Sequence, residues 1–146
     1  MIETKKKIIA IIPARIGSKG VKYKNLRKIK NLTLIELSII LLKKIKFIDT
    51  IAVSTDSKKI QKIATRHKVW CKKLRPKHIS GDKSHTFEAI DHVLKQLNTQ
   101  YDYICEIQPT YAFRKISTIK KSIKKIVNKN IIDSLISVSK VKDTAH

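Results

Sequence analysis

Apolar residues along the chain follow two alternating spacings. Short continuous apolar runs, typical of strands buried on both faces of a parallel sheet, alternate with stretches in which apolar residues recur every three or four positions. The runs predict five strands, at residues 8–12, 50–54, 69–74, 103–107 and 135–138. Lysines interrupt the third run, and we therefore expect it to be an edge strand.

The stretches with helical spacing begin at recognisable capping residues. Thr33 precedes a helix over residues 34–45, and Ser57 precedes the next one, since hydroxyl side chains are favoured N-caps. Ser84 or His85 opens a third helix, and residues 117–127 form a fourth. The side chains expected to face the core are, helix by helix, Leu34, Leu37, Leu41 and Ile45; Ile60, Ile63 and Ala64; Phe87, Ile90, Val93, Leu94 and Leu97; and Ile119, Ile123 and Ile126.

Strands that alternate with helices predict an α/β fold, Rossmann-like, with a mostly parallel sheet flanked by helices. The 146 residues are enough for one domain, which we place at 1–146. We expect the strand order 3-2-1-4-5, in which the first and fourth strands are neighbours.

Glycine and proline are scarce and unevenly placed. All of them lie just beyond the carboxyl ends of the first, third and fourth predicted strands, the edge where open α/β sheets bind ligands. Ordinary turns are the alternative interpretation, since both residue types favour turns. These residues are Pro13, Pro76, Pro109, Gly17, Gly20 and Gly81.

The loop after the first strand combines two glycines with positive charge. Gly17 and Gly20 would let the chain turn back and present backbone N–H groups, and Arg15 and Lys19 would add cations. The spacing matches neither a Walker A loop nor the dinucleotide fingerprint. The residues alone thus predict a phosphate or nucleotide site, with a solvated basic loop as the alternative.

The net charge of +22 would ordinarily suggest nucleic acid. Only five of the 33 basic residues are arginines, and the lysines occur in nearly every element rather than in one patch. The few aromatic residues form no stacking motif. We therefore expect no specific nucleic-acid partner, only salt-sensitive adhesion to polyanions.

Other sequence features are consistent with a cytoplasmic protein without a membrane partner. No apolar run approaches the roughly 18 residues of a membrane helix, and no signal peptide is evident. Cys71 and Cys105 form no C-x-x-C pair, and we expect buried, reduced thiols. The histidines show no spacing typical of metal ligands, and no metal-binding residue is assigned.

The segment at residues 13–25, P-A-R-I-G-S-K-G-V-K-Y-K-N, resembles the opening signature of the acylneuraminate (CMP-sialic acid) cytidylyltransferases, approximately P-A-R-x-G-S-K-G-x-x-x-K-N. The resemblance extends over essentially the whole chain. Further family motifs follow in the expected order: Val53-Ser54-Thr55-Asp56, Arg75-Pro76, Ser80-Gly81-Asp82, and Gln108-Pro109-Thr110 with Arg114.

The resemblance implies a nucleotidyltransferase of the CMP-nonulosonic acid synthetase type. Such an enzyme transfers CMP from CTP to a sialic-acid-like sugar and releases pyrophosphate, with Mg²⁺ assisting. The resemblance also implies residue roles: Arg15, Ser18, Lys19 and Lys24 hold the triphosphate, Asn25 and Arg75 help to fix the nucleotide, and Gln108 lies near the reacting groups. Of these, Arg15, Lys24 and Gln108 are the candidate catalytic residues. Asp56 is either a site carboxylate or a helix cap.

The chain departs from the family pattern in three ways. Ile16 replaces the first of two usual glycines, and Tyr111-Ala112-Phe113 replaces a frequent Ser-Pro-Leu. Family members also continue beyond the point that matches His146, through a segment with metal-binding aspartates, sugar contacts and dimer contacts. Two alternatives therefore stay open: a truncated CTP-binding relative with little activity, and a basic nucleic-acid-binding α/β module. A homodimer is one arrangement that the resemblance suggests.

Overall fold

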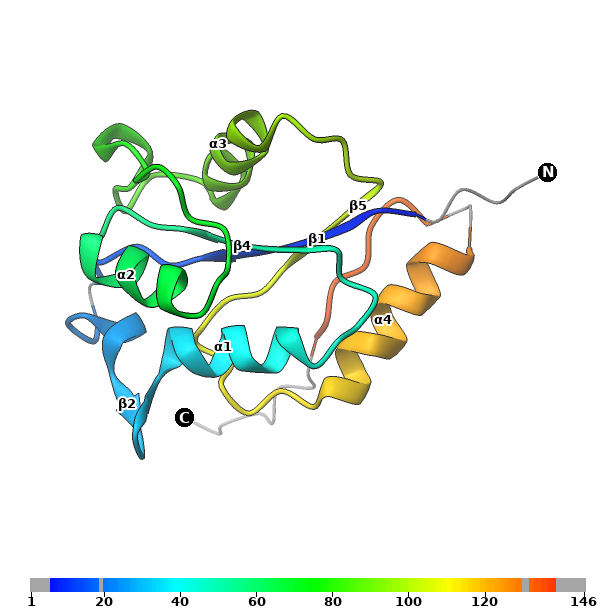
Figure 1. The fold of residues 1–146 in the computed structure, drawn as a ribbon, viewed down its shortest axis with the longest axis horizontal. Coiled ribbons are helices and arrows are strands. Elements are labelled where there is room, and N and C mark those ends of the chain that lie inside the picture. The colour runs from blue at the N-terminus through cyan, green and yellow to red at the C-terminus, as the bar shows by residue number, and fades with distance from the viewer. Residues whose placement is uncertain (1–5, 19, 130–131, 139–146) are drawn as a thin grey trace, which may run out of the picture.

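The computed structural model describes residues 6–18, 20–129 and 132–138, which form an α/β layered fold (Figure 1). Its central sheet is parallel and has the order β4-β1-β5, with β1 at Ile8–Pro13, β4 at Thr50–Ser54 and β5 at Tyr103–Glu106. Ile9 pairs with Thr50 on one side and with Ile104 on the other. The expected adjacency of the first and fourth strands is therefore confirmed.

Helices cover both faces of this sheet. α1 (Leu34–Lys43), α2 (Lys58–Arg66) and α4 (Ile116–Asn128) lie on one face, and α3 (Thr86–Leu97) lies on the other (Figure 1). Two short 3₁₀ helices, η1 (Lys24–Leu26) and η2 (Lys77–Ile79), and a small hairpin of β2 (Lys28–Ile29) and β3 (Leu32–Thr33) complete the described elements.

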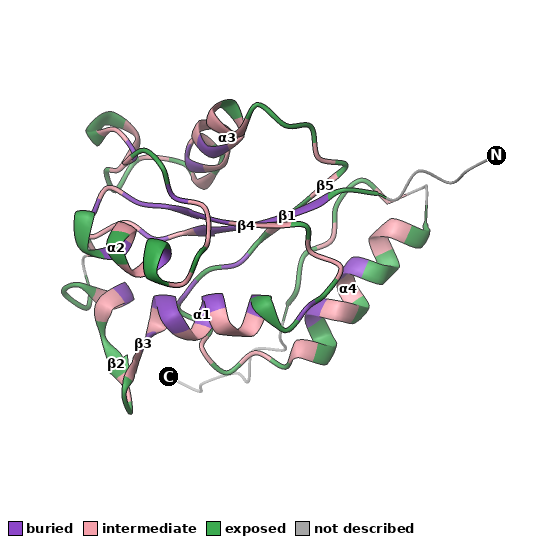
Figure 2. Cartoon of the chain, in the orientation of Figure 1, coloured by how far each residue is buried: buried purple, intermediate pink, exposed green. Residues whose placement is uncertain are grey.

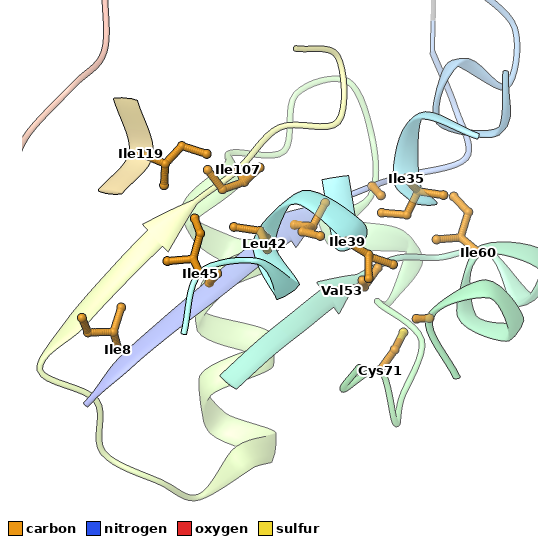
Figure 3. Close-up of a cluster of buried hydrophobic side chains, with 14 of the residues drawn as sticks. Ile8, Ile35, Ile39, Leu42, Ile45, Val53, Ile60, Cys71, Ile107 and Ile119 are labelled. Atoms are coloured by element: carbon orange, nitrogen blue, oxygen red, sulfur yellow. The ribbon is translucent and has the colours of Figure 1, made fainter. Parts of the chain in front are cut away.

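The middle strand explains the first apolar run. Ile8, Ala10 and Ile12 belong to the larger core cluster, whereas Ile9 and Ile11 belong to a smaller one under α3. β1 is thus buried on both faces (Figure 2), so no position in it favours a polar side chain. The larger cluster joins the sheet to α1, α2 and α4 (Figure 3).

Both predicted hydroxyl caps are confirmed. The Ser57 side chain accepts a hydrogen bond from the Ile60 N–H, and Thr33 forms a reciprocal capping box with Glu36. Cys71 and Cys105 are free thiols, although Cys105 is only partly buried. Burial raises the pKa of each thiol to about 11, so neither is a reactive thiolate at neutral pH.

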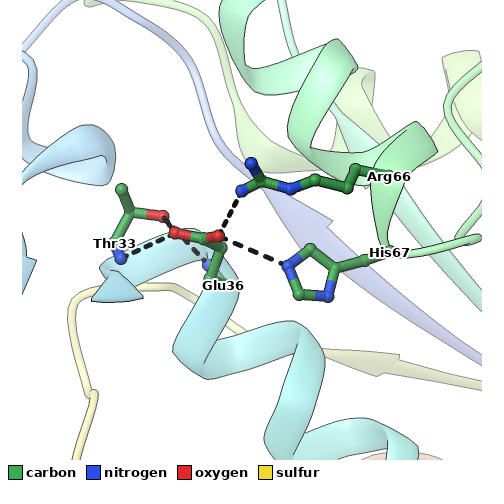
Figure 4. A network of polar contacts seen from close by, with 4 residues as sticks. All are labelled: Thr33, Glu36, Arg66 and His67. Carbon is green, nitrogen blue, oxygen red and sulfur yellow. Dashed lines mark hydrogen bonds and ion pairs between the residues drawn. The ribbon is translucent and has the colours of Figure 1, made fainter. Parts of the chain in front are cut away.

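A buried carboxylate ties α1 to the end of α2 (Figure 4). Glu36, only 7% exposed, accepts hydrogen bonds from the Thr33 N–H at 2.9 Å and the Thr33 hydroxyl at 2.7 Å. Arg66 and His67 contact its other oxygen. Burial raises the pKa of Glu36, but the hydrogen bonds from Thr33 and His67 and the charge of Arg66 outweigh it. The net pKa is about 2.

Two predicted strands differ from the structure. The third is reduced to one parallel bridge between Ala52 and Trp70, after which the chain leaves the sheet. The fifth is wrong: residues 132–138 have no regular secondary structure, and Ile136 and Val138 are 81% and 87% exposed. A strand requires a hydrogen-bonded neighbour, and nothing in the described part of the chain pairs with these residues.

The buried faces of two helices also differ from the predicted ones. In α1 the fully buried side chains are Ile35, Ile39 and Leu42, so the core face is rotated from the predicted one, although Ile45 is buried as expected. The helix is apolar nearly all round, and its periodicity therefore did not define one face. Phe87 is 73% exposed, because the buried positions of α3 are Ala89 and Val93.

Candidate functional site

A cavity of about 250 Å³ lies at the carboxyl edge of the sheet. Its lining comes from three segments: the loop after β1, the segment between the Trp70 bridge and the start of α3, and the loop after β5. Arg15 and Gln108 both line it, because β1 and β5 are neighbours. Six of the seven predicted site residues line the cavity: Arg15, Ser18, Lys24, Asn25, Arg75 and Gln108. The seventh, Lys19, lies outside the described residues.

Backbone anchors hold the loop after β1 in place. The Ala14 N–H donates to the Ser54 carbonyl at 2.8 Å, and the Ile16 N–H donates to Asp56 Oδ1 at 2.7 Å. The buried Asn25 amide donates to the Arg15 carbonyl at 2.9 Å. Asp56 is therefore neither the helix cap, which is Ser57, nor a residue lining the cavity; it fixes the loop.

The backbone conformation of the two glycines in this loop differs from the expected one. Neither Gly17 nor Gly20 has a positive φ, and among the described residues of this loop the left-handed one is Tyr23, with φ 55°. A Cβ added at Gly17 would meet no atom within 4 Å. Ile16 packs toward the core and is not part of the cavity lining. Its bulk is therefore directed toward the core and not into the cavity.

Arg75 is a buried cation with unsatisfied donors. Its side chain lines the cavity, the residue is 7% exposed, and its backbone N–H donates to the Thr55 carbonyl at 2.7 Å. Nε and Nη2 are buried, and neither has an acceptor within the described ranges. Such groups are costly unless a ligand supplies acceptor atoms.

The electrostatics around Arg75 agree with a positive charge that is only partly compensated. Burial lowers the pKa of Arg75, Asp56 raises it, and the nearby charge of Arg15 lowers it further. The pKa of His92 is lowered by burial and then by the charge of Arg75. The cavity therefore favours ligands that bring negative charge.

The Arg15 side chain forms an ion pair with Asp82. Its Nη2 lies 2.7 Å from Asp82 Oδ1, with side-chain exposures of 33% and 42%. Asp82 is the only acidic side chain among the described lining residues, which also include the cations Lys24 and Arg75. The N-terminus of α3 reaches the same cavity through His85 and Thr86, and a helix N-terminus favours anions.

The loop after β5 is held by its own contacts. Gln108 Nε2 donates to Glu106 Oε1 at 3.1 Å, and Arg114 donates to the Gln108 carbonyl at 2.8 Å. Arg114 also lies 5.2 Å from the centre of the Tyr111 ring. Tyr111 and Phe113 are 67% and 85% exposed, next to the Gln108–Thr110 part of the lining.

Sequence reasoning gave no role to several lining residues. Ser84 and His85 were considered only as alternative helix starts, Asp82 only as part of a family motif, and Thr86 was not singled out. The signal that could have found them was their position after the third strand, at the same edge as Arg15.

The described residues do not fit a metal site. Within residues 6–18, 20–129 and 132–138, no group of three or more His, Cys, Asp or Glu side chains could hold an ion. Asp82, the one carboxylate at the cavity, contacts Arg15 instead.

No helix among the described residues is long and apolar enough to cross a membrane.

Known proteins resemble the chain in sequence. It is 32% identical over 138 residues to CMP-N,N'-diacetyllegionaminic acid synthase of Legionella pneumophila, covering 92% of this chain and 59% of that protein. It is 36% identical to the N-acylneuraminate cytidylyltransferase of Escherichia coli, covering 81% of this chain and 28% of that protein. The chain thus spans less than two thirds of the length of either relative.

Solved structures share the fold. A CMP:2-keto-3-deoxy-manno-octonic acid synthetase complexed with CTP superposes with a TM-score of 0.70 at 15% identity, covering 84% of this chain and 48% of that one. A cytidylyltransferase from Leptospira borgpetersenii gives a TM-score of 0.69 at 17% identity, covering 86% and 50%. The cytidylyltransferase family model matches residues 9–145, nearly the whole chain. The chain therefore belongs to the cytidylyltransferase family.

Proposed function

We propose that the chain binds CTP in the cavity at the sheet edge and serves the transfer of CMP to a nonulosonic acid such as a sialic acid. The observation that carries this proposal is Arg75, whose buried N–H groups lack acceptors beside the cations Arg15 and Lys24. A nucleoside triphosphate supplies both the acceptor oxygens and the negative charge. The names of the two relatives specify the cytidylyl group and a sugar acid.

The reaction needs charge neutralisation more than a covalent catalyst. A sugar hydroxyl oxygen forms a bond to the α-phosphorus of CTP and gives up its proton to water, and the bond from that phosphorus to the pyrophosphate oxygen breaks. Arg15, Ser18, Lys19 and Lys24 would hold the triphosphate, so that charge developing on the leaving pyrophosphate meets cations already in place.

The remaining candidate residues fix the nucleotide and its surroundings. Arg75 would donate to ligand oxygens, while Asn25 holds the Arg15 backbone and so keeps the cation in register. Gln108 would lie near the reacting groups, on the loop across the cavity from Arg15.

Mg²⁺ is the cofactor that the family resemblance implies, and it would supply further neutralisation of the phosphates. The described residues do not form a site for it. A homodimer and a cytoplasmic location stay predictions.

A second version of this function is that these 146 residues by themselves bind CTP but turn it over poorly. The chain spans 59% and 28% of the two relatives' lengths.

The direct test is nucleotide binding measured by calorimetry and by thermal unfolding. We expect CTP to bind and to raise the unfolding temperature more than ATP does, by mass action on the folded state. Lys24→Ala should weaken CTP binding about 10- to 100-fold, since a charge-assisted contact contributes about 1.5–3 kcal/mol. Lys62→Ala, on the exposed face of α2, is the matched control. Equal binding of all nucleotides, unaffected by Lys24→Ala, would contradict the proposal.

A further inference from the structure

Asp82 is the exception in the charge pattern of the cavity. The described lining residues include three cationic side chains, Arg15, Lys24 and Arg75, and one carboxylate, that of Asp82. A carboxylate at this position repels a polyphosphate. It also lies 2.7 Å from Nη2 of Arg15, so it uses an N–H donor that a phosphate oxygen would need.

We infer that Asp82 is the resident counter-ion of Arg15, and that the phosphate groups of a nucleotide displace it when they bind. The inference rests on the proposed function, since the displacing ligand is a polyphosphate. Asp82 then lowers the affinity of the site, because a phosphate that takes this Nη2 contact must first break the ion pair.

The Arg15 backbone is held independently of the ion pair. Its carbonyl accepts a hydrogen bond from Asn25, and its neighbours Ala14 and Ile16 donate to Ser54 and Asp56. None of these contacts involves Asp82. The Arg15 side chain can therefore change partners while its backbone stays in place.

The loop that carries Asp82 is also pinned by its own contacts. The Gly81 N–H donates to the Ser84 hydroxyl at 3.1 Å, and that hydroxyl donates to the His78 carbonyl at 3.3 Å. The Ser80 hydroxyl donates to the Pro76 carbonyl at 2.8 Å. Loss of the ion pair should thus leave both loops folded.

The ion pair is also weak enough to exchange. Both side chains are partly exposed, 33% for Arg15 and 42% for Asp82, and ion pairs of this kind contribute little because water screens them. A polyphosphate carries more negative charge than one carboxylate and offers a bidentate contact to the guanidinium. Phosphate should therefore win the competition, at the cost of reduced affinity.

The test compares Asp82→Asn with the wild-type chain by calorimetric titration of inorganic pyrophosphate and of CTP. The variant removes the charge and keeps the shape. We expect it to bind pyrophosphate about three- to fivefold more tightly, the gain expected when an exposed ion pair no longer competes. Asp91→Asn is the matched control, because Asp91 pairs with Lys95 on α3, is 39% exposed and lies outside the cavity lining. It should leave both affinities unchanged.

A double-mutant cycle shows whether Asp82 acts through Arg15. In the Arg15→Ala background, Asp82→Asn should lose most of its gain. A gain of undiminished size in that background would overturn the displacement, because Asp82 would then act by long-range repulsion alone. Asp82→Ala, checked for cooperative thermal unfolding, repeats the measurement if the asparagine variant folds poorly.

The remaining outcomes are also decisive. Weaker binding by Asp82→Asn would show that Asp82 positions Arg15 for the ligand, and unchanged binding would show that the ion pair does not affect affinity. Either result overturns the inference. CTP binding by the wild-type chain would still uphold the proposed function. If neither the wild-type chain nor the variant binds pyrophosphate or CTP, the proposed function fails and the inference fails with it.

Discussion

Asp56 accepts a hydrogen bond from the Ile16 backbone N–H, with 2.7 Å between Oδ1 and N. The contact joins the loop after β1 to the segment after β4, 40 positions away in the sequence. It places the Arg15 backbone at the sheet edge without using any side chain that lines the cavity.

We predict that Asp56→Ala weakens both the fold and CTP binding. The free energy of unfolding should fall by about 1.5–3 kcal/mol, the range for a hydrogen bond to a charged group. CTP affinity should fall as well, because the loop carrying Arg15 loses its anchor. Urea unfolding and calorimetry measure the two effects. Asp91→Ala is the control, and an Asp56→Ala variant with native affinity would show that the loop is held without this contact.

Replacing Arg75 should separate stability from binding. Arg75→Met removes a buried charge whose Nε and Nη2 lack acceptors in the described chain, so the free energy of unfolding without ligand should stay equal or rise. The same change should abolish the protection that CTP gives against thermal unfolding. Lys62→Met, on the exposed face of α2, should alter neither. Strong destabilisation by Arg75→Met would mean that the guanidinium stabilises the fold rather than awaiting a ligand.

Acid should destabilise the chain through Glu36. Its pKa is lowered from 4.5 to about 2 in the folded state, so its contribution is fully present above about pH 4.5 and is lost as the pH falls toward 2. The full contribution is about 3 kcal/mol, of which about 2 kcal/mol should be lost between pH 6 and pH 3.

Urea unfolding at these two pH values measures the loss. Glu36→Gln should be less stable than the wild-type chain at pH 6 and should show a smaller further loss at pH 3. Asp133→Asn, at an exposed position, should keep the wild-type pH dependence. A wild-type pH dependence in Glu36→Gln would assign the acid sensitivity to other carboxylates.

The chain alone should release pyrophosphate from CTP slowly or not at all. The chain has the loops expected to hold CTP, but it spans 59% and 28% of the lengths of two relatives. The measurement is pyrophosphate release with CTP, Mg²⁺ and a panel of nonulosonic acids. The C-terminal half of a full-length relative, added in trans, should restore some activity, and Lys24→Ala should suppress it. Release by the chain alone at about 1 s⁻¹ or faster, typical of working enzymes, would contradict this prediction.

Local sequence patterns were sufficient for the outline of the fold and for the sheet edge at which the cavity lies. The unbroken apolar run of β1 predicted a strand buried on both faces, and Thr33 and Ser57 predicted two helix starts. Parallel strands end at one edge, so residues just after the first and fourth strands had to meet if those strands were neighbours. Arg15 and Gln108 line the same cavity for that reason.

Tertiary structure alone decided what the individual side chains do. No local pattern shows that Asp56 holds Ile16, that Asp82 holds Arg15, or that burial leaves the Arg75 guanidinium without acceptors. These relationships join residues distant in sequence, and each depends on which loops the sheet brings together. The segment at 135–138 illustrates the same limit: its apolar residues favour a strand, but a strand forms only where another strand supplies hydrogen bonds. Periodicity thus indicated most of the elements, whereas long-range packing decided which predicted strands formed and which side chains came together at the candidate site.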